Sequence, residues 1–494
     1  MYHMRIVLLI GLCISIDGIT QPGTLDLSFD PGTGTDVSVY STQIQPDGKI
    51  FLGGDFHTYN GVVRNSVARL LEDGSLDSTF ASGFGAPGCV YASALLPNGQ
   101  ILIGGSFTSY DGRPTGRIAR LQGNGVLDTT FNPGVGADLE VRAILVQADG
   151  KILISGIFTS YSGTPCNRIA RLHDDGSLDS TFNSQLELIT SYAVLALALQ
   201  SDGKLLIGGD FGVYAGVPRL RIARINDDGS LDTTFDPGAG ASNSIQSILT
   251  IADGKILIGG RFQQYDGSNR MNIAMLNSDG SIYPGFDHGS ELGYDPGPAA
   301  HGTFSLALQP DGKVLVGGRF RSPTGITGIS RLNYDGSRDT TFNPSNGATL
   351  HAGQSSAYIY SVEIQSDGKI IIGGTMWEYD SVPRKGVARI NGDNIITSAP
   401  ISVSTGTSAN PLSLWPNPNQ GNSFHMSLKQ VPSSNATIEV ADTQGGTVHL
   451  ERKTFGLSPC EAIVNLPNSL RPGVYYVRVF FEEGAFISRL TVMR

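Results

Sequence analysis

The sequence offers few side chains in arrangements that could perform catalysis. It has no serine nucleophile elbow, no zinc-binding HExxH sequence, no phosphate-binding glycine loop and no EF-hand calcium loop. Three of its eight histidines nevertheless fall in two segments, residues 287–302 and 343–358. The side chains there that are best suited to bind a ligand are His288, Tyr294, Asp295, His301, His351 and Tyr358. Because nothing in their spacing fixes a metal site, we expect neither a metal nor a cofactor.

The same region contains the one pair of carboxyl groups that could serve hydrolysis. Glu291 and Asp295 lie close in sequence, and a glycosidase needs a general acid together with a base or nucleophile. This pair is weak evidence for an enzyme, so we expect a non-catalytic binding or adhesion protein for a glycan or a surface protein. A secreted polysaccharide hydrolase or lyase, and a purely structural envelope protein, are the alternatives.

Charge and hydropathy exclude two classes of partner. The chain has 34 Lys and Arg against 44 Asp and Glu, which gives a net charge of −10. Nucleic acid is therefore not expected as a ligand, because phosphate binding needs clustered basic residues. No segment beyond the N-terminus is long and apolar enough to cross a membrane.

An internal repeat dominates the chain. The triplet Asp-Gly-Lys, or its variant Asn-Gly-Gln, begins at residues 47, 98, 149, 202, 253, 311 and 367. Each copy leads into an apolar run such as residues 49–56, then a loop of type Phe-x-x-Tyr-x-Gly, an Ile-Ala-Arg-Leu segment and an Asp-Gly-Ser-Leu-Asp-Ser-Thr-Phe segment. We expect four strands per unit, A to D, with tight turns at Pro46-Asp47-Gly48 and Glu72-Asp73-Gly74. The loop tyrosines Tyr59, Tyr110, Tyr161, Tyr214 and Tyr265 are expected to pack in the core, unless they are exposed and stack on sugars.

Charged residues support the pairing of strands C and D. A three-residue turn places an arginine of strand C opposite an aspartate of strand D, which predicts cross-strand ion pairs. The expected pairs are Arg69 with Asp77, Arg120 with Asp128, Arg171 with Asp179, Arg224 with Asp232, and Arg331 with Asp339. In the fifth unit both partners change together, to Met275 and Tyr283.

The last unit lacks its own strand D, whereas the chain begins with one. Residues 24–29 resemble strand D and no strand C precedes them. We therefore expect them to complete the seventh blade beside residues 387–390, with Asp26 pairing with Arg389. The predicted fold is all-β: a seven-bladed β-propeller with four-stranded blades, closed by an N-terminal strand, over residues 21–397.

The repeat resembles the bacterial delta-60 repeat, a β-propeller family, over about residues 23–397. In a propeller, the A–B and C–D turns share one face, and the B–C and D–A loops share the other. The long segments 287–302 and 343–358 are D–A connections of adjacent blades. We expect them to form a shared recognition site, because loops on a rigid scaffold commonly bind ligands.

Both ends of the chain carry export signals. Residues 1–20 have a basic start and a short apolar run, which is typical of a secretory signal peptide. After its removal three cysteines remain, widely spaced, which predicts no disulfide framework. Residues 398–411 form a Ser/Thr-rich linker, and residues 412–494 contain alternating runs expected of a small β-sandwich.

The C-terminal segment resembles the sorting domain of type IX (Por) secretion substrates. The matching pieces are Trp415-Pro416-Asn417-Pro418, Asp442 with Gly445, Pro472-Gly473-Val474-Tyr475, and Ser488-Arg489-Leu490. The resemblance implies that the type IX machinery recognises residues 412–494, exports the protein across the outer membrane and removes this domain. A location at the outer cell surface or in the medium is expected.

Overall fold

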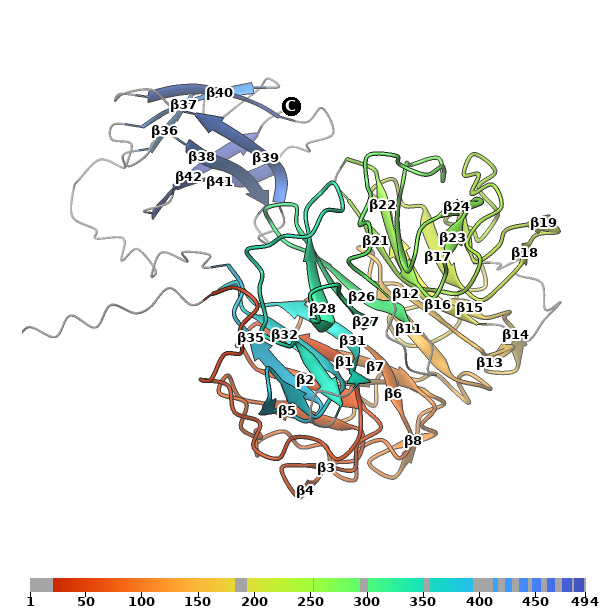
Figure 1. The fold of residues 1–494 in the computed structure, drawn as a ribbon. Coiled ribbons are helices and arrows are strands. Elements are labelled where there is room, and N and C mark those ends of the chain that lie inside the picture. The colour runs from red at the N-terminus through yellow and green to blue at the C-terminus, as the bar shows by residue number, and fades with distance from the viewer. Residues whose placement is uncertain are drawn as a thin grey trace, which may run out of the picture. The chain divides into compact units, whose positions relative to one another are not determined.

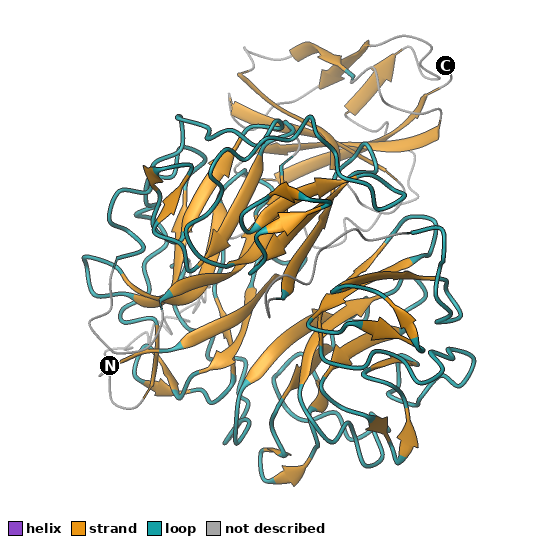
Figure 2. Ribbon diagram, turned by 90° about the vertical axis from the view of Figure 1, so that its right-hand side faces the viewer, coloured by secondary structure: helices purple, strands orange, loops and turns teal. Residues whose placement is uncertain are grey.

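The computed structural model describes two compact units, residues 1–393 and 394–494, which are treated separately below. Within the first unit the description covers residues 21–393 except 183–192, 252, 294–300 and 351–354. In the second unit it covers the backbone of the strands between residues 412 and 492, and some of their side chains. The expected signal peptide and linker lie outside the described residues. All regular structure in the described part is β-strand (Figure 2).

The first unit contains seven three-stranded antiparallel sheets, which are the blades. The inner strands are β1 (Val39–Ile44), β6 (Val90–Leu95), β11 (Val141–Val146), β16 (Val194–Leu199), β21 (Ile245–Thr250), β26 (Gly302–Leu308) and β31 (Tyr358–Ile364). The middle strands are β2 (Ile50–Gly54), β7 (Ile101–Gly105), β12 (Ile152–Gly156), β17 (Leu205–Gly209), β22 (Ile256–Gly260), β27 (Val314–Arg321) and β32 (Ile370–Thr375). The outer strands are β5 (Val67–Leu70), β10 (Ile118–Leu121), β15 (Ile169–Leu172), β20 (Ile222–Ile225), β25 (Ile273–Leu276), β28 (Thr327–Leu332) and β35 (Val387–Ile390).

The blades close into a ring. Each inner strand contacts the inner strand of the next blade, and β1 of the first blade contacts β31 of the last (Figure 1). The N-terminal segment completes the seventh blade, because Leu25 forms an antiparallel bridge with Ile390. Beside this bridge the Asp26 amide donates to the Arg389 carbonyl at 2.9 Å. The predicted seven-bladed propeller, closed by its N-terminal strand, is confirmed.

The fourth segment of each blade is shorter than the sequence predicts. In the first blade it pairs with β5 only at the bridge between Leu70 and Leu76 and through the Asp77 amide. The Asp77 carboxylate then accepts hydrogen bonds from the amide and the hydroxyl of Thr79, at 2.9 and 2.6 Å. This Asx-type turn directs the backbone away from the sheet, so strand pairing ends there.

The paired glycines of the repeat have two different packing roles. A Cβ on Gly105, at the end of β7, would lie 1.9 Å from the Cys89 carbonyl oxygen, because the inner strand is bulged beside it. A Cβ on the preceding Gly104 would instead meet side-chain atoms of Val141 and Ile144 in the next blade. The third blade has Ser155 at this first position. Only the second glycine is therefore required by the backbone.

Small hairpins project from six blades between the middle and outer strands. They are β3 (Thr58–Tyr59) with β4 (Val62–Val63), β8 (Ser109–Tyr110) with β9 (Arg113–Pro114), β13 (Ser160–Tyr161) with β14 (Thr164–Pro165), β18 (Val213–Tyr214) with β19 (Val217–Pro218), β23 (Gln264–Tyr265) with β24 (Ser268–Asn269), and β33 (Glu378–Tyr379) with β34 (Val382–Pro383). In the sixth blade, β27 and β28 are longer instead and pair as far as Arg321 and Thr327. Part of the segment 343–358 forms β29 (Ala348–Leu350) and β30 (Ser355–Ser356), which join β33 and β34 in one sheet.

The second unit consists of two antiparallel sheets. One contains β36 (Leu412–Trp415), β37 (Ser423–Leu428) and β40 (Cys460–Asn465). The other contains β38 (Asn435–Asp442), β39 (Thr447–Thr454), β41 (Gly473–Phe481) and β42 (Gly484–Val492). Both sheets contribute buried apolar side chains, among them Met426 and Val464 from the first and Ile438 and Val477 from the second. The predicted small β-sandwich is confirmed.

Candidate functional site

The structure brings together every arginine–aspartate pair expected from the repeat. The Nε atom of each arginine lies 2.7 to 2.9 Å from Oδ2 of its aspartate, in the pairs Arg69–Asp77, Arg120–Asp128, Arg171–Asp179, Arg224–Asp232, Arg331–Asp339 and Arg389–Asp26. All twelve side chains are buried. The pKa of Asp77 falls to about 2; burial alone would raise it, but the hydrogen bonds from Thr79 and the charge of Arg69 outweigh burial.

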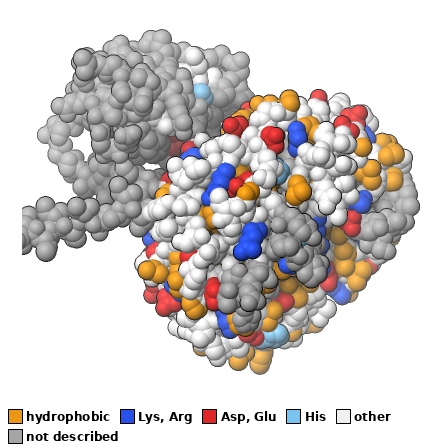
Figure 3. All heavy atoms as spheres, in the orientation of Figure 1, with side chains coloured by type: hydrophobic (Ala, Val, Ile, Leu, Met, Phe, Trp, Pro, Cys, Tyr) orange, Lys and Arg blue, Asp and Glu red, His pale blue; other side chains and the backbone are white. Residues whose placement is uncertain are grey.

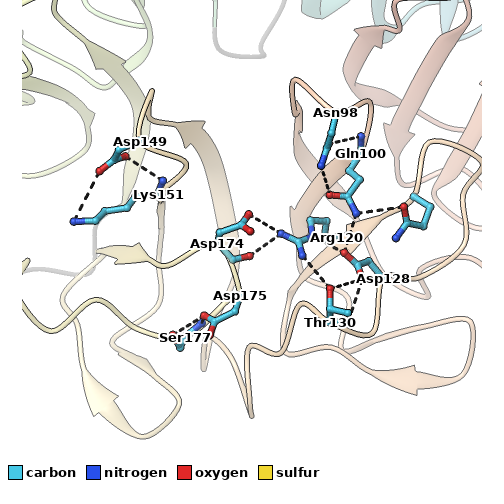
Figure 4. A network of polar contacts seen from close by, with 11 residues as sticks. Asn98, Gln100, Arg120, Asp128, Thr130, Asp149, Lys151, Asp174, Asp175 and Ser177 are labelled. Atoms are coloured by element: carbon cyan, nitrogen blue, oxygen red, sulfur yellow. Dashed lines mark hydrogen bonds and ion pairs between the residues drawn. The ribbon is translucent and has the colours of Figure 1, made fainter.

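The same arginines also connect neighbouring blades, which the sequence analysis missed. Arg120 donates through Nη1 to the Asp174 carbonyl of the next blade at 2.6 Å (Figure 4). Arg389 of the seventh blade donates in the same way to the Glu72 carbonyl of the first blade at 2.5 Å. These residues therefore stabilise the ring, and they are not available to a ligand.

The fifth blade replaces this contact with a different one. Lys255 forms an ion pair with Asp253 at 2.7 Å, and Asp253 accepts a hydrogen bond from the Tyr334 hydroxyl of the sixth blade. The Lys255 ammonium also lies 4.7 Å from the centre of the Tyr283 ring. Met275 and Tyr283 therefore substitute together because an aromatic–cation contact takes the place of the arginine–aspartate pair.

The repeated loop tyrosines are structural. Tyr59, Tyr110, Tyr161, Tyr214 and Tyr265 are fully buried. The Tyr59 hydroxyl donates to the Gly74 carbonyl at 2.6 Å, and the other four make the equivalent bond. Because no ring face is exposed, these tyrosines cannot stack on sugars.

The two long connections differ from the recognition loops that the sequence suggests. His288 is buried, and burial lowers the pKa of its imidazole. Glu291 is also buried: it accepts a hydrogen bond from Ser330 at 2.8 Å and lies 3.5 Å from Arg338. Burial raises the pKa of Glu291, although these two contacts oppose the rise. Glu291 therefore packs within the sixth blade and is not presented as a catalytic acid. Tyr294, Asp295 and His351 lie outside the described residues.

His301 and Tyr358 lie where the two connections enter inner strands. His301 immediately precedes β26, and Tyr358 is the first residue of β31. The Tyr358 ring stacks on Phe304 of β26 with an interplanar angle of 11° and a centroid distance of 6.2 Å. The structure thus brings the ends of both connections together at one aromatic contact between the sixth and seventh blades.

This contact is part of a larger aromatic group, which we call the aromatic arc: Phe304, Tyr358, Tyr360, Tyr40 and Tyr91. The ring centroids of Phe304 and Tyr360 are 5.5 Å apart, those of Tyr360 and Tyr40 are 5.1 Å apart, and those of Tyr40 and Tyr91 are 5.3 Å apart. Apart from Tyr358, these residues occupy the same repeat position, near the start of the inner strand. Because the inner strands surround the central axis and begin where the D–A connections end, the arc lies around this axis on the loop face, a position that we call the mouth of the channel.

Arginines lie at both ends of the aromatic arc. The Arg142 guanidinium of the third blade is 3.8 Å from the centre of the Tyr91 ring, and the Arg261 guanidinium of the fifth blade is 5.4 Å from Phe304. Arg319 lies over Tyr358 at 4.8 Å and donates to its hydroxyl. The four tyrosines are partly exposed, whereas the repeated loop tyrosines are not.

A polar pocket of about 480 Å³ lies on the same face, beside the segment 343–358. It is lined by Arg321, Gly325, Thr327, Asn346, Thr349, Glu378 and Ser381. The backbone of Arg321 also reaches the end of the other long connection, because its amide donates to the Gly293 carbonyl at 3.4 Å. Of the residues expected to form a shared site, Tyr358 is partly exposed and His288 is buried, and ligand recognition by the two connections stays a prediction.

Two protein-family profiles match the chain, and together they cover its repeats and its C-terminal unit. The profile described as "Domain of unknown function (DUF5122) beta-propeller" matches the chain seven times, at residues 45–80, 96–131, 147–182, 200–235, 251–286, 309–342 and 365–393. The chain belongs to this β-propeller family. A second profile, described as "Secretion system C-terminal sorting domain", matches residues 413–493. Both resemblances seen in the sequence are confirmed, and the delta-60 name is compatible with the first family.

Solved structures of two other proteins are more distantly similar to this chain. PorZ, described as an essential bacterial surface component of the type IX secretion system of Porphyromonas gingivalis, is 15% identical, with a TM-score of 0.41 over 97% of this chain and 60% of that chain. Puromycin hydrolase is 13% identical, with a TM-score of 0.43 over 83% of this chain and 62% of that chain. The chain thus spans about three fifths of each of these proteins. No curated protein sequence matches it.

The sorting domain identifies the protein as one exported by type IX secretion, either to the cell surface or into the medium. Among the described residues, no helix is long and apolar enough to span a membrane. On the face shown in Figure 3, Lys and Arg side chains lie scattered among acidic and uncharged ones and form no continuous basic stripe.

Proposed function

We propose that this protein is a secreted, non-catalytic propeller that binds a saccharide at the aromatic arc, at the outer cell surface. The observation that carries the proposal is the position of the arc: rings from four blades meet at the mouth of the channel on the loop face, and the four tyrosines among them are partly exposed. The sorting domain supports the surface location, because a protein exported by this route encounters extracellular polymers.

Aromatic side chains suit a saccharide ligand. A tyrosine combines a flat apolar body, which packs on the C–H face of a sugar ring, with a hydroxyl that forms hydrogen bonds. Burial is the main reason that the pKa of the Tyr40 hydroxyl is raised, so this group remains a neutral donor at physiological pH. Tyr40 donates to Asp55 at 3.2 Å, which provides a polar edge next to the rings.

Aromatic residues occupy the arc position in only some of the blades. At the same repeat position the fourth blade has Leu195 and the fifth has Gln246, so closing the blades does not require an aromatic residue there. The aromatic residues occupy four consecutive blades around the ring: the sixth, the seventh, the first and the second. A requirement of the fold would repeat seven times, and a grouping on one side supports a role in binding.

We propose binding without turnover because the carboxyl groups near the arc are engaged by other groups; Glu140, for example, pairs with Arg142. Glu291, the acid available in the long connections, is held by Ser330 and Arg338 within the sixth blade. Asp55 is occupied by Tyr40 and by the Ser38 amide, which donates to it at 2.9 Å. Hydrolysis of a glycosidic bond needs two carboxyl groups flanking that bond.

The test is a glycan array probed with the full chain, with the products of bound glycans monitored over time. The matched variants are Tyr360→Ala in the arc and Leu195→Ala at the same position of the fourth blade. We expect saccharide binding that Tyr360→Ala weakens at least tenfold and Leu195→Ala leaves unchanged, with no product formed. Binding of a surface protein in place of every glycan, or release of a product, would contradict the proposal.

A further inference from the structure

We propose that the saccharide bound at the aromatic arc is anionic, and that Arg261 binds its carboxylate or sulfate group. This inference rests on the proposed function and adds the chemical class of the ligand. It comes from the charges that surround the arc, and in particular from the end of the arc formed by the fifth and sixth blades.

Arg261 differs from Arg142, at the other end of the aromatic arc, in having no acidic partner among the described residues. Arg142, at the opposite end of the arc, pairs with Glu140. Arg221 pairs with Asp210 at 3.1 Å. Arg261 is exposed and its side chain contacts the aromatic ring of Phe304, so its charge is not neutralised by a neighbouring side chain.

The position of Arg261 in the repeat supports a specific role. It directly follows the paired glycines of the middle strand, next to the start of the inner strand. In the first and fourth blades the equivalent residues are Asp55 and Asp210, whereas in the fifth and sixth blades they are Arg261 and Arg319. At this position the side chains are therefore acidic in some blades and basic in others. The two basic residues lie next to Phe304 and Tyr358.

The stacking of Arg261 leaves its hydrogen-bond donors available. A guanidinium carries its five N–H groups in one plane, so a contact over the face of Phe304 leaves the donors at the edge of that plane. These donors match the two oxygens of a carboxylate or a sulfate. The guanidinium also lies near Tyr360: burial raises the pKa of that hydroxyl, and the charge of Arg261 opposes the rise.

The net negative charge of the whole chain means that an anionic ligand must be selected by local contacts. With a net charge of −10 the protein repels polyanions at long range, so a general basic surface cannot explain an anionic ligand. Selection of such a ligand must come from contacts at the site. Arg261 supplies the charge-assisted contact, and the aromatic arc supplies the surface for the sugar ring.

The experiment measures binding of the full chain to polygalacturonate and to its methyl ester, which share one backbone and differ in charge. The variants are Arg261→Gln, Arg261→Lys and, as a matched control, Arg113→Gln on the exposed hairpin β8–β9. We expect the wild-type chain and Arg113→Gln to bind the acid form about tenfold more tightly than the ester, the difference that one hydrogen bond to a charged group provides. Arg261→Gln should bind both forms equally, and Arg261→Lys should retain part of the preference.

The outcomes separate this inference from the proposed function. Equal binding of acid and ester by the wild-type chain overturns the inference and leaves saccharide binding intact. A preference for the acid form that survives in Arg261→Gln, with an unchanged thermal midpoint, overturns the role of Arg261. Absence of binding to either polymer, together with no binding to any neutral glycan, overturns both proposals.

Discussion

Closure of the propeller should depend on the contact between Arg389 and Asp26. The change to make is Arg389→Met, which copies the residue that the fifth blade has at this position. The variant loses the bond of Arg389 to Asp26 at 2.7 Å and its bond to the Glu72 carbonyl of the first blade at 2.5 Å. The N-terminal segment is then held mainly by the bridge between Leu25 and Ile390 and by its backbone hydrogen bonds.

The size of the effect follows from what remains around Asp26. Removing one partner of a buried ion pair typically costs about 3–5 kcal/mol, because the other charge stays buried. Asp26 keeps Lys369 at 3.0 Å and two hydrogen bonds from Ser28, which reduces that cost. Loss of the bond to the Glu72 carbonyl adds about 1 kcal/mol. We therefore expect closure to be destabilised by about 2–4 kcal/mol.

Hydrogen exchange measures this directly. The amides of residues 22–30, followed by mass spectrometry, should exchange about 30 to 1,000 times faster in Arg389→Met, since 1.4 kcal/mol corresponds to about a factor of ten. The double variant Asp26→Tyr/Arg389→Met reproduces the pair of the fifth blade, and Lys369 is available to contact the ring. It should recover most of the protection. Equal exchange in the wild-type chain and Arg389→Met would refute the reasoning, as would equal losses in the single and double variants.

Three further outcomes are expected. Gly105→Ala should prevent or strongly destabilise folding, because its Cβ would overlap a backbone carbonyl, whereas Gly104→Ser should cost less, because its Cβ meets side-chain atoms that can shift and the third blade has Ser155 at that position; similar thermal midpoints for the two variants would contradict this. The free energy of unfolding should fall as the pH drops from 5 to 2: the pKa of Asp77 is about 2 in the folded state and near 3.9 when unfolded, so its stabilisation is complete above about pH 5 and is lost on acidification; a flat profile in denaturant titrations would count against it. Burial raises the pKa of the half-buried Glu363 to about 7, so its contribution declines as the pH rises from 4.5 through 7, and Glu363→Gln should raise the thermal midpoint at pH 8 but not at pH 4; equal shifts at both values would be inconsistent with a carboxyl group of raised pKa.

Local sequence patterns were sufficient to predict the blades and their closure. The turn Pro46-Asp47-Gly48 fixes the register of strands A and B, and Gly48 has the positive φ of 80° that such a turn needs. The missing strand D at the end of the repeats, with a spare copy at the start, fixed the position of residues 24–29. These features depend on neighbouring residues, or on counting copies, and both can be read along the chain.

The contacts between blades could not be predicted in the same way. Arg120 reaches Asp174, which is 54 residues away, and the sequence does not give the distance between consecutive blades. His288 and Glu291 were interpreted as ligand-binding or catalytic candidates because they lie in a long connection, yet both are buried. Length variation indicated where the chain departs from the repeat but not which side chains pack inward.

The aromatic arc was missed except for Tyr358, although a signal for it exists. Tyr40, Tyr91, Phe304 and Tyr360 occupy one position of the repeat, directly after the residue that pairs with the second glycine of the middle strand. Aligning the seven copies at that residue shows four aromatic residues in consecutive blades. This signal lies within the strands, and the lengths of the loops do not indicate it.

The most direct test of binding at the channel mouth is a titration of the full chain with the tightest saccharide from the array, followed by calorimetry. The comparison is between the wild-type chain, the double variant Tyr91→Ala/Tyr360→Ala and the control Leu195→Ala. We predict saturable binding that the double variant weakens by about a hundredfold or more, which corresponds to about 1.4 kcal/mol for each lost ring, and that the control retains. Unchanged affinity in a folded double variant would contradict a binding site at the aromatic arc.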